Sequence, residues 1–319
     1  MTSAAMRLLV AAALAASTGC AGGGGPATGA PPDRAAVSRP SADALAARIA
    51  GAVAASGAEV GVYYRSLAAG GDSVLVGADV RMHAASTMKV PVMIQLYRDA
   101  DTGRLSMDGS LTVDTVFPSI VDGSPYALSR TSDSDDALYE RAGEGVAVRE
   151  LVERMITRSS NLATNLLIDE ADASRVTATM RSLGADSIHV LRGVEDIPAF
   201  RAGLSNTTTA RDLGVILGAL ASGRAASPPS SREMLAILER QEFREKIPAG
   251  VPAGTRVANK TGWITGIHHD AAVVFPEGAP PYVLVVLIRG FEEDEAAATA
   301  LARRISEMAW THHTTEAQS

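Results

Sequence analysis

Strand-forming segments at both ends of the chain, with helical segments between them, constrain the fold more than any other feature. Near the N-terminal end, "AEVGVYYRSL" and "DSVLVGADV" flank the turn-forming "AAGG", which predicts a hairpin. Near the C-terminal end, "DAAVVF" and "PYVLVVLIRG" flank the turn signal "PEGAPP". The residues between these pairs show mostly helical periodicity. The pattern therefore predicts an α+β fold, with one antiparallel sheet and flanking helices built from both ends and an inserted all-helical lobe.

The same pattern sets approximate lobe boundaries. We expect a lobe of strands and helices from about 41–84 and 226–315, and a helical lobe at about 85–225. Ser41 is predicted to cap the first helix, and a last helix is expected from Phe291 to about Thr311. A cleft between two such lobes is the natural place for a functional site.

The first 40 residues are predicted to lie outside the fold. "MRLLVAAALAASTGC" has one charge and an apolar stretch well short of the ~20 residues of a membrane span, as in an export signal. The only cysteine, Cys20, ends "ASTGC", which resembles a bacterial lipobox with Ser17 where leucine is usual. We expect residues 1–20 to be a lipoprotein-type signal with lipidation at Cys20, a plain signal peptide being the alternative. Residues 21–40, rich in Gly, Pro and Ala, are predicted to form a flexible linker.

Composition excludes several classes of function. A single cysteine rules out an intrachain disulfide and a thiolate metal site. The formal net charge of −7 and the lack of a basic cluster argue against a nucleic-acid partner. His268, His269 and Asp270 are consecutive on a predicted strand, so neighbouring side chains point to opposite faces and make poor co-ligands. We therefore expect no metal, no cofactor and a monomer that acts on a small-molecule substrate.

The choice of lysine over arginine marks the first candidate for catalysis. The chain has three lysines, Lys89, Lys246 and Lys260, and otherwise uses arginine as its cation. Ser86 and Lys89 are spaced i, i+3, so they share one helix face. A serine nucleophile needs a base, and a lysine can serve only if its pKa falls from ~10.4 by about three units, a cost of ~4 kcal/mol. Arginine cannot lose its proton, which explains why lysine stands here.

Two more segments complete an ordered set of motifs. "RSSNLATN" supplies Ser159 and Asn161 near the start of a predicted helix, and "NKTGWITG" supplies Lys260, Thr261 and Gly262 just ahead of "DAAVVF". Alone, each motif has a plain structural explanation: a helix surface, a helix cap and a strand followed by a turn. Together, the order S-x-x-K, S-x-N, K-T-G is the signature of class A β-lactamases and penicillin-binding proteins. Two of the three lysines fall in these motifs and the third falls outside them.

On these motifs, the chain resembles the class A β-lactamase-like serine hydrolases of the serine β-lactamase and penicillin-binding protein superfamily, over about residues 41–315. The resemblance implies the two-lobe fold. It also implies that Ser86 is the acylated nucleophile, that Lys89 is its base partner, and that Ser159 carries the proton to the leaving nitrogen. It further implies a substrate-binding set of Asn161, Lys260, Thr261, Gly262 and Trp263. In that set Asn161 holds the amide side chain, Lys260 and Thr261 hold the carboxylate, and the N–H groups of Ser86 and Trp263 form an oxyanion hole.

The chain departs from the family pattern in the middle of the second motif. Ser160 stands where the family has an aspartate. Because the role of that acid is structural, we expect adjustment rather than loss of function. The acidic run "TSDSDDALYE", further upstream, is expected to be a solvated helix start.

The loop "LRGVEDIPAFRAGLSNTTTARDL" is a second departure. By the resemblance, Glu195 is the best candidate for activating the water that deacylates the enzyme, although the Leu-Asn pattern that follows it in the family is absent. Two alternatives remain: a salt bridge of Glu195 with Arg192 or Arg201, and Asp196 in the same role. We expect this loop to dock over the site through three apolar residues, Ile197, Pro198 and Phe200.

The predicted function is hydrolysis of β-lactams through a serine acyl-enzyme. One alternative is a D-alanyl-D-alanine peptidase, or a related esterase or amidase, that acts on a peptidoglycan peptide. Another is a protein that binds β-lactams and does not turn them over. Glu195 separates these functions, since only the first requires it. The predicted location is outside the cytoplasm, in the periplasm or tethered to the membrane through the N-terminal lipid.

Overall fold

The computed structural model describes residues 41–317 of the chain. Its main sheet has five antiparallel strands in the order β2-β1-β11-β10-β9. Their bounds are β1 (Glu59–Ser66), β2 (Ser73–Val76), β9 (Arg256–Ile264), β10 (Ile267–Phe275) and β11 (Tyr282–Arg289). The N-terminal hairpin joins the C-terminal strands because β1 pairs with β11 along its whole length. The predicted α+β class, with one sheet from both ends, is therefore confirmed. The predictions for the export signal, Cys20 and the linker lie outside the described residues.

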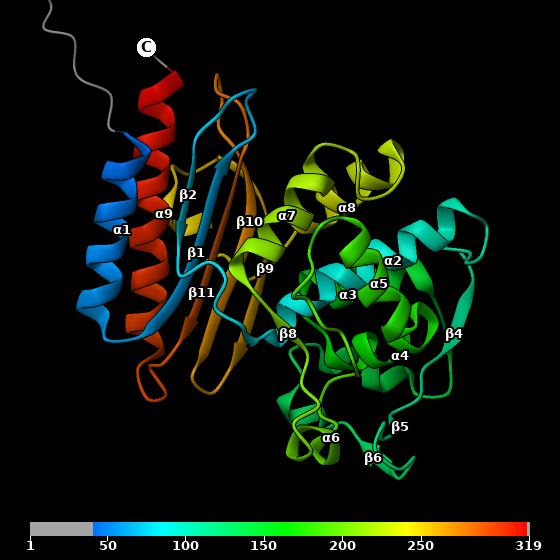
Figure 1. Cartoon of the computed structure of the whole chain (residues 1–319). Coiled ribbons are helices and arrows are strands. Elements are labelled where there is room, and N and C mark those ends of the chain that lie inside the picture. The colour runs from blue at the N-terminus through cyan, green and yellow to red at the C-terminus, as the bar shows by residue number, and fades with distance from the viewer. Residues whose placement is uncertain (1–40, 318–319) are drawn as a thin grey trace, which may run out of the picture. The chain divides into compact units, whose positions relative to one another are not determined.

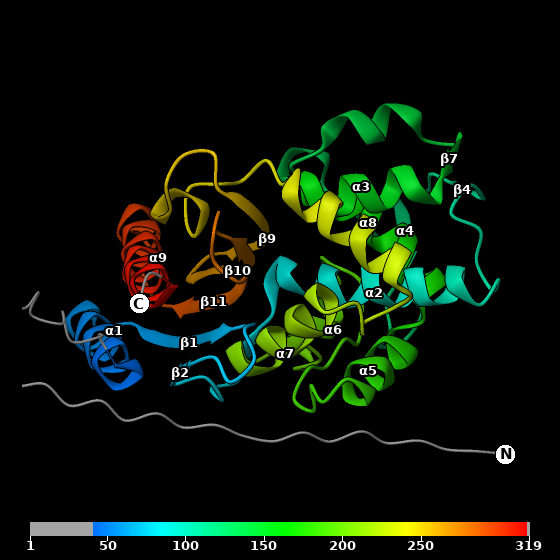
Figure 2. The same cartoon turned by 90° about the horizontal axis from the view of Figure 1, so that it is seen from above.

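Helices α1 (Ala42–Ser56) and α9 (Glu295–Ala317) cover one face of this sheet (Figures 1 and 2). Their apolar residues meet the sheet in a core that includes Ile49, Val62, Leu284 and Ile305. Ser41 caps α1 as predicted, since its Oγ accepts a hydrogen bond from the N–H of Ala44 at 3.2 Å.

Helix α9 begins later than the sequence indicated. Phe291 has a φ of 59°, in the left-handed region, which interrupts a right-handed helix. The carboxylate of Asp294 then accepts a hydrogen bond from the N–H of Ala297, as an N-cap does. Three acidic residues, Glu292, Glu293 and Asp294, therefore precede the helix, and Glu295 lies in its first turn.

The opposite face of the sheet is covered by α7 (Ala210–Ala221), which packs on β1, β10 and β11. Its approach is close: a Cβ added at Gly214 would lie 2.2 Å from a ring carbon of Tyr63. Helix α7 thus lies on the sheet although it belongs to the stretch of mostly helical periodicity. Helix α8 (Pro228–Glu239) packs beside it, against β9.

The helical lobe is built around α2 (Lys89–Asp101), which is buried along nearly its whole length. Helices α3 (Val148–Thr157), α4 (Asn161–Ala171) and α5 (Ala173–Ser182) pack on it, and the short helix α6 (Ile197–Arg201) lies in the loop that follows α5. Short 3-10 helices are η1 (Ala85–Met88), η2 (Arg130–Ser132), η3 (Asp136–Arg141) and η4 (Pro248–Gly250). Three two-stranded ribbons pair β3 (Met82–His83) with β8 (Thr207–Thr208), β4 (Ser110–Thr112) with β7 (Gly145–Ala147), and β5 (Val116–Pro118) with β6 (Pro125–Ala127). Within residues 41–317, no helix combines the length and apolar character needed to span a membrane.

Candidate active site

The backbone just before Ser86 is strained and firmly held. Ala85 has a φ of 44°, which is unusual for a residue other than glycine. The Nδ1 atom of His83 accepts a hydrogen bond from the N–H of Ala85 at 3.0 Å, and Thr87 Oγ1 donates to the Ala84 carbonyl at 2.6 Å. Since η1 leads directly into α2, Ser86 stands at the N-terminal end of the most buried helix of the lobe.

A buried histidine ties this turn to the sheet. His269 Nδ1 accepts from the N–H of Ile288 at 3.1 Å, so its Nε2 carries the hydrogen that is donated to the His83 carbonyl at 2.9 Å. Burial lowers the pKa of His269 to about 3, which keeps the ring neutral. The neighbouring His268 instead approaches the Phe291 carbonyl. Among residues 41–317, no three His, Cys, Asp or Glu side chains are grouped as a metal site would require.

Lys89 is fully buried and lies against the second motif. Its Nζ donates to the Ser159 carbonyl at 2.6 Å, to Ser159 Oγ at 3.3 Å and to Asn161 Oδ1 at 3.0 Å. Burial lowers the pKa of Lys89 to about 7, against the opposing effect of the Asp133 and Glu195 carboxylates. A substantial fraction of this amine is therefore neutral at neutral pH, as the sequence required of a base.

Lys260 approaches the same serine from the sheet. Its Nζ donates to Ser159 Oγ at 3.0 Å and to the Thr261 carbonyl at 2.9 Å. Burial, together with the charge of Lys89, holds the pKa of Lys260 well below its usual value. Ser159 lies just before α4 with a φ of 58°, in the left-handed region. Its Oγ is hydrogen-bonded to both motif lysines. The residues of the second and third motifs therefore converge with Lys89 of the first.

Strand β9 lies directly against the turn that carries Ser86. A Cβ added at Gly262 would lie 3.2 Å from the backbone nitrogens of Ser86 and Thr87, so this position needs glycine for close approach. A cavity of about 380 Å³ opens here, lined by Ser86, Ser159, Asn161, Thr261 and Trp263 among others. Five of the nine predicted site residues within residues 41–317 therefore line one cavity.

The structure adds the third lysine, which the motifs did not include. Lys246 is 2% exposed and lines the same cavity. Its segment is held to the sheet by the buried Asp270, whose two oxygens accept from the N–H of Ile247 and from Asn259 Nδ2, both at 3.0 Å. The charge of Lys246 is one cause of the lowered pKa of Lys260. The scarcity of lysine was the available signal, since all three lysines of the chain meet at this site.

Glu195 reaches the site through Asn161. Its Oε1 accepts from Asn161 Nδ2 at 3.1 Å, and its Oε2 accepts from the N–H of Ser129 at 3.2 Å. Arg192 donates instead to the carbonyls of Gly193 and Leu204. Within the described residues, no ion pair joins Glu195 to an arginine, so the salt-bridge interpretation is wrong.

The adjacent Asp196 has a different task. Its buried carboxylate accepts from Ser119 Oγ at 2.8 Å and from the N–H groups of Ile120 and Ala199, both at 3.0 Å. Burial would raise the pKa of Asp196, but these bonds and Arg192 keep it below its usual value. Asp196 therefore caps α6 and fastens the loop to the β5–β6 ribbon.

Polar contacts, rather than apolar ones, hold the rest of this loop. Asn165 bonds both the N–H and the carbonyl of Val194, and Asn206 bonds the N–H of Leu191 and the carbonyl of Arg192. The three apolar residues expected to dock the loop, Ile197, Pro198 and Phe200, are all exposed. The expectation is therefore wrong for Ile197 and Pro198, whereas the ring of Phe200, although exposed, packs edge to face on His83 with 6.4 Å between the ring centroids. Side-chain amides satisfy the backbone groups of the loop named above.

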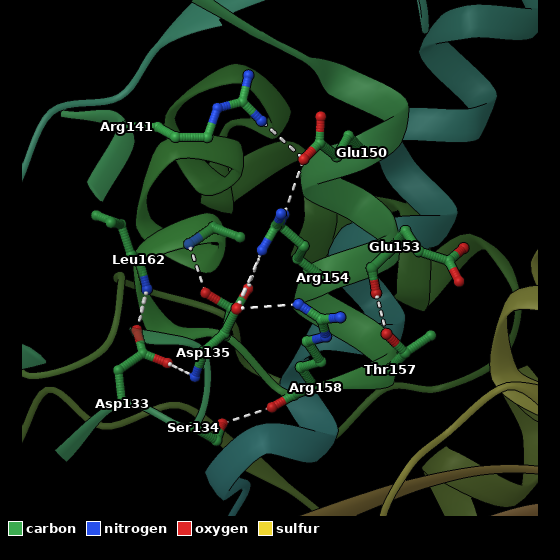
Figure 3. Close-up of polar contacts among 12 residues, drawn as sticks. Asp133, Ser134, Asp135, Arg141, Glu150, Glu153, Arg154, Thr157, Arg158 and Leu162 are labelled. Carbon is green, nitrogen blue, oxygen red and sulfur yellow. Dashed lines mark hydrogen bonds and ion pairs between the residues drawn. The ribbon is translucent and has the colours of Figure 1, made fainter. Parts of the chain in front are cut away.

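The acidic run upstream is not simply solvated. Asp135 is buried in an ion-pair network with Arg154 and Arg158 (Figure 3). Asp133 accepts hydrogen bonds from the first backbone N–H groups of α4, whereas Ser160 caps the helix through Ala163 N at 3.2 Å. The run contains four acids, at positions 133, 135, 136 and 140. The expectation of a solvated helix start is wrong for Asp133 and Asp135.

Comparisons with known proteins agree with this geometry. Residues 44–313 match the model of a family described as the beta-lactamase enzyme family. A β-lactamase of Streptomyces lavendulae is 30% identical over 256 residues, which are 77% of this chain and 79% of that protein. The solved structure of PBP-A has a TM-score of 0.73 at 27% identity, covering 85% of this chain and 96% of that one. An ancestral class A β-lactamase has a TM-score of 0.73 at 26% identity, covering 84% and 99%.

Proposed function

Because the chain belongs to the beta-lactamase enzyme family, we propose that it is a class A-type β-lactamase, hydrolysing β-lactam antibiotics through a serine acyl-enzyme. The observation that carries the proposal is the position of Ser159, whose Oγ lies 3.3 Å from Lys89 Nζ and 3.0 Å from Lys260 Nζ, in the cavity that Ser86 lines. This arrangement suits acyl transfer because a nucleophile and a proton carrier line one cavity, and a base that can be neutral is hydrogen-bonded to the proton carrier.

Acylation begins when Ser86 Oγ attacks the β-lactam carbonyl carbon. The neutral amine of Lys89 takes the serine proton, and Ser159 passes a proton to the ring nitrogen as the C–N bond breaks. The hydrogen bond between Lys89 and Ser159 supports this transfer. The backbone N–H groups of Ser86 and Trp263 stabilise the oxyanion, which is consistent with the close approach of β9 to η1.

Substrate binding uses both sides of the cavity. Asn161 holds the amide side chain of the substrate. Lys260 and Thr261 hold its carboxylate, with Gly262 allowing close approach, and we add Lys246 as a second cation for that carboxylate. The support for Lys246 is its position on the cavity wall, where a buried ammonium needs an anionic partner beyond Glu245, 3.4 Å away.

Deacylation requires a water molecule activated beside the acyl ester. Glu195 fills this role because its carboxylate is hydrogen-bonded to Asn161, which also contacts Lys89. An acyl-enzyme that formed on Ser86 would therefore have a carboxylate one hydrogen bond beyond Asn161, which lines the cavity. The missing Leu-Asn pattern affects how this loop is held, and the asparagines at 165 and 206 hold it here.

The second candidate function is that of a penicillin-binding peptidase, or a β-lactam-binding protein without turnover. The similarity to PBP-A supports it as an alternative, because the TM-score of 0.73 is the same for PBP-A as for the ancestral class A β-lactamase. These functions need Ser86, Lys89 and Ser159 but not Glu195.

Two measurements test the function. Purified protein should open the coloured β-lactam nitrocefin over many turnovers. Mass spectrometry after mixing with a penicillin should show one transient adduct, on the peptide containing Ser86, and none in Ser86→Ala. A persistent wild-type adduct identifies the second candidate, and an adduct elsewhere refutes the assignment of Ser86.

Export and anchoring are a separate part of the proposal. The lipobox-like "ASTGC" supports lipidation at Cys20 and a periplasmic, membrane-tethered monomer. Full-length protein expressed in a bacterial host should partition with membranes, and Cys20→Ala should release it or block its processing. Soluble wild-type protein would leave the plain signal peptide as the explanation.

A further inference from the structure

A carboxylate from a distant loop stands at the start of α4, where the second motif lacks its acid. Asp133 accepts from the N–H of Asn161 at 3.1 and 3.0 Å through its two oxygens, and from the N–H of Leu162 at 2.8 Å. The first N–H groups of a helix have no partner within the helix, and its positive end favours an anion. Ser160 satisfies only the N–H of Ala163. Asp133 thus accepts the hydrogen bonds of the first two N–H groups of α4, which Ser160 does not accept.

The loop that presents Asp133 is rigidly fastened. Tyr139 donates its hydroxyl hydrogen to Asp133 Oδ2 at 3.1 Å, and the N–H of Asp135 donates to Oδ1 at 3.1 Å. Asp135 is itself paired with Arg154 at 2.9 Å and with Arg158 at 3.3 Å (Figure 3). Both arginines stand at the C-terminal end of α3, immediately before the second motif. The loop and the motif are therefore held as one unit.

Asn161 connects Asp133 to the residues proposed to catalyse the reaction. Its backbone is held by Asp133, and its side chain donates to Glu195 at 3.1 Å while accepting from Lys89 at 3.0 Å. We propose that Asp133 is a positioning residue, which supplies from the loop before η3 the carboxylate absent at Ser160 and thereby fixes Asn161 between Lys89 and Glu195. The inference rests on the proposed function, because it assigns Asp133 to the same reaction.

A charge effect accompanies the positional one. Three charged groups face Lys89: the carboxylates of Asp133 and Glu195, which raise its pKa, and the neighbouring Lys260. Removing the charge of Asp133 leaves Glu195 alone against burial and Lys260. The pKa of Lys89 then falls, so the acid limb of the acylation rate moves to lower pH.

The test compares Asp133→Asn with Asp136→Asn, an exposed acid of the same run that lies outside the cavity lining. We expect Asp133→Asn to lower the rate of acylation by a penicillin on the order of 10- to 100-fold, as expected for misplaced catalytic groups, and to shift its acid limb downward. Asp136→Asn should change neither. An unchanged rate and pH profile in Asp133→Asn overturns the inference, and so does a slower rate without a shift of the acid limb.

A rescue experiment with a double variant tests the inference more stringently. Asp133→Asn combined with Ser160→Asp returns a carboxylate to the motif. If the carboxylate is what matters, the double variant should recover most of the acylation rate that Asp133→Asn loses. Failure to recover overturns the inference. If Asp133→Asn does not fold, Tyr139→Phe removes only the bond to Asp133, and it is expected to slow acylation about twofold to fivefold. An equal rate in Tyr139→Phe and wild type then overturns the inference.

Acylation, rather than turnover, is the quantity measured, so the outcome is independent of deacylation. Wild-type protein that acylates but does not turn over refutes the β-lactamase assignment while leaving the Asp133 comparison readable. Wild-type protein that is not acylated refutes the proposed function itself.

Discussion

Two walls of the proposed active site, named below for the roles proposed for them in acylation and deacylation, are built in different ways. The acylation wall consists of Ser86, Lys89, Ser159 and Lys260, and both of its lysines are fully buried and donate to fixed acceptors inside the protein. The deacylation loop, residues 191–206, presents a partly exposed Glu195 at a φ of 60° and is held by contacts with Asn165, Asn206 and Asp196.

The difference follows from what each wall must do. A lysine base works only when burial has lowered its pKa, so the acylation wall has to exclude water. A carboxylate that activates water must remain reachable by that water, so the deacylation loop has to stay at the surface. Burial therefore fixes the first wall, whereas the second depends on a few polar anchors.

The largest effect is expected from Lys89→Arg. Arginine keeps the charge but cannot be deprotonated, so acylation should fall by the 10²–10⁴-fold typical of a lost general base. Stopped-flow acylation by a penicillin measures this. A loss of less than tenfold would mean that burial of the amine is not what the acylation wall provides.

Glu195→Gln should act mainly on the other wall, although loss of its charge also lowers the pKa of Lys89 and moves the acid limb of acylation to lower pH. Acylation should proceed at nearly the wild-type rate, whereas deacylation slows by about 10²–10⁴-fold, and the adduct should persist for minutes to hours in time-resolved mass spectrometry. Normal turnover would show that another group holds the water.

Asp196→Asn is the matched contrast within the loop. It removes a charge that anchors the loop through three hydrogen bonds, so it should lower the free energy of unfolding by about 1–3 kcal/mol. Glu195→Gln should leave that free energy nearly unchanged. Equal destabilisation by the two variants, measured by urea denaturation, would contradict the distinct tasks of these neighbouring acids.

Lys246→Met separates substrate binding from acylation chemistry. Loss of a cation that pairs with the substrate carboxylate should raise KM about tenfold with little change in kcat. A fall in kcat comparable to that of Lys89→Arg would instead place Lys246 in the acylation wall.

The last prediction concerns pH. Lys89 must be neutral to accept a proton, and its pKa is about 7, so the acylation rate should fall as pH drops below 7, approaching tenfold per pH unit. The measurement is the acylation rate between pH 5 and 9. A rate that is flat across this range would show that Lys89 is not the base.

Local patterns made much of the fold predictable. The hairpin β1–β2, the strands β10 and β11 and the cap at Ser41 could be predicted because alternation, turn residues and capping act over a few positions. The start of α9 was predicted too early because the acidic composition after Phe291 favours a helix. The left-handed backbone of Phe291 does not fit a right-handed helix, so α9 begins only at Glu295. The motifs and the resemblance they carry predicted Ser86, Lys89, Ser159 and Lys260 as site residues without the structure.

Tertiary structure alone decided which other charges join the site. Lys246 reaches the cavity because the buried Asp270 of β10 fastens its segment to the sheet. Asp133 reaches α4 because Tyr139 and the Asp135 network fix its loop. Such contacts join residues far apart in sequence, and no local periodicity records them. The sequence determined which side chains are available for catalysis, whereas packing between distant segments determined which of them meet.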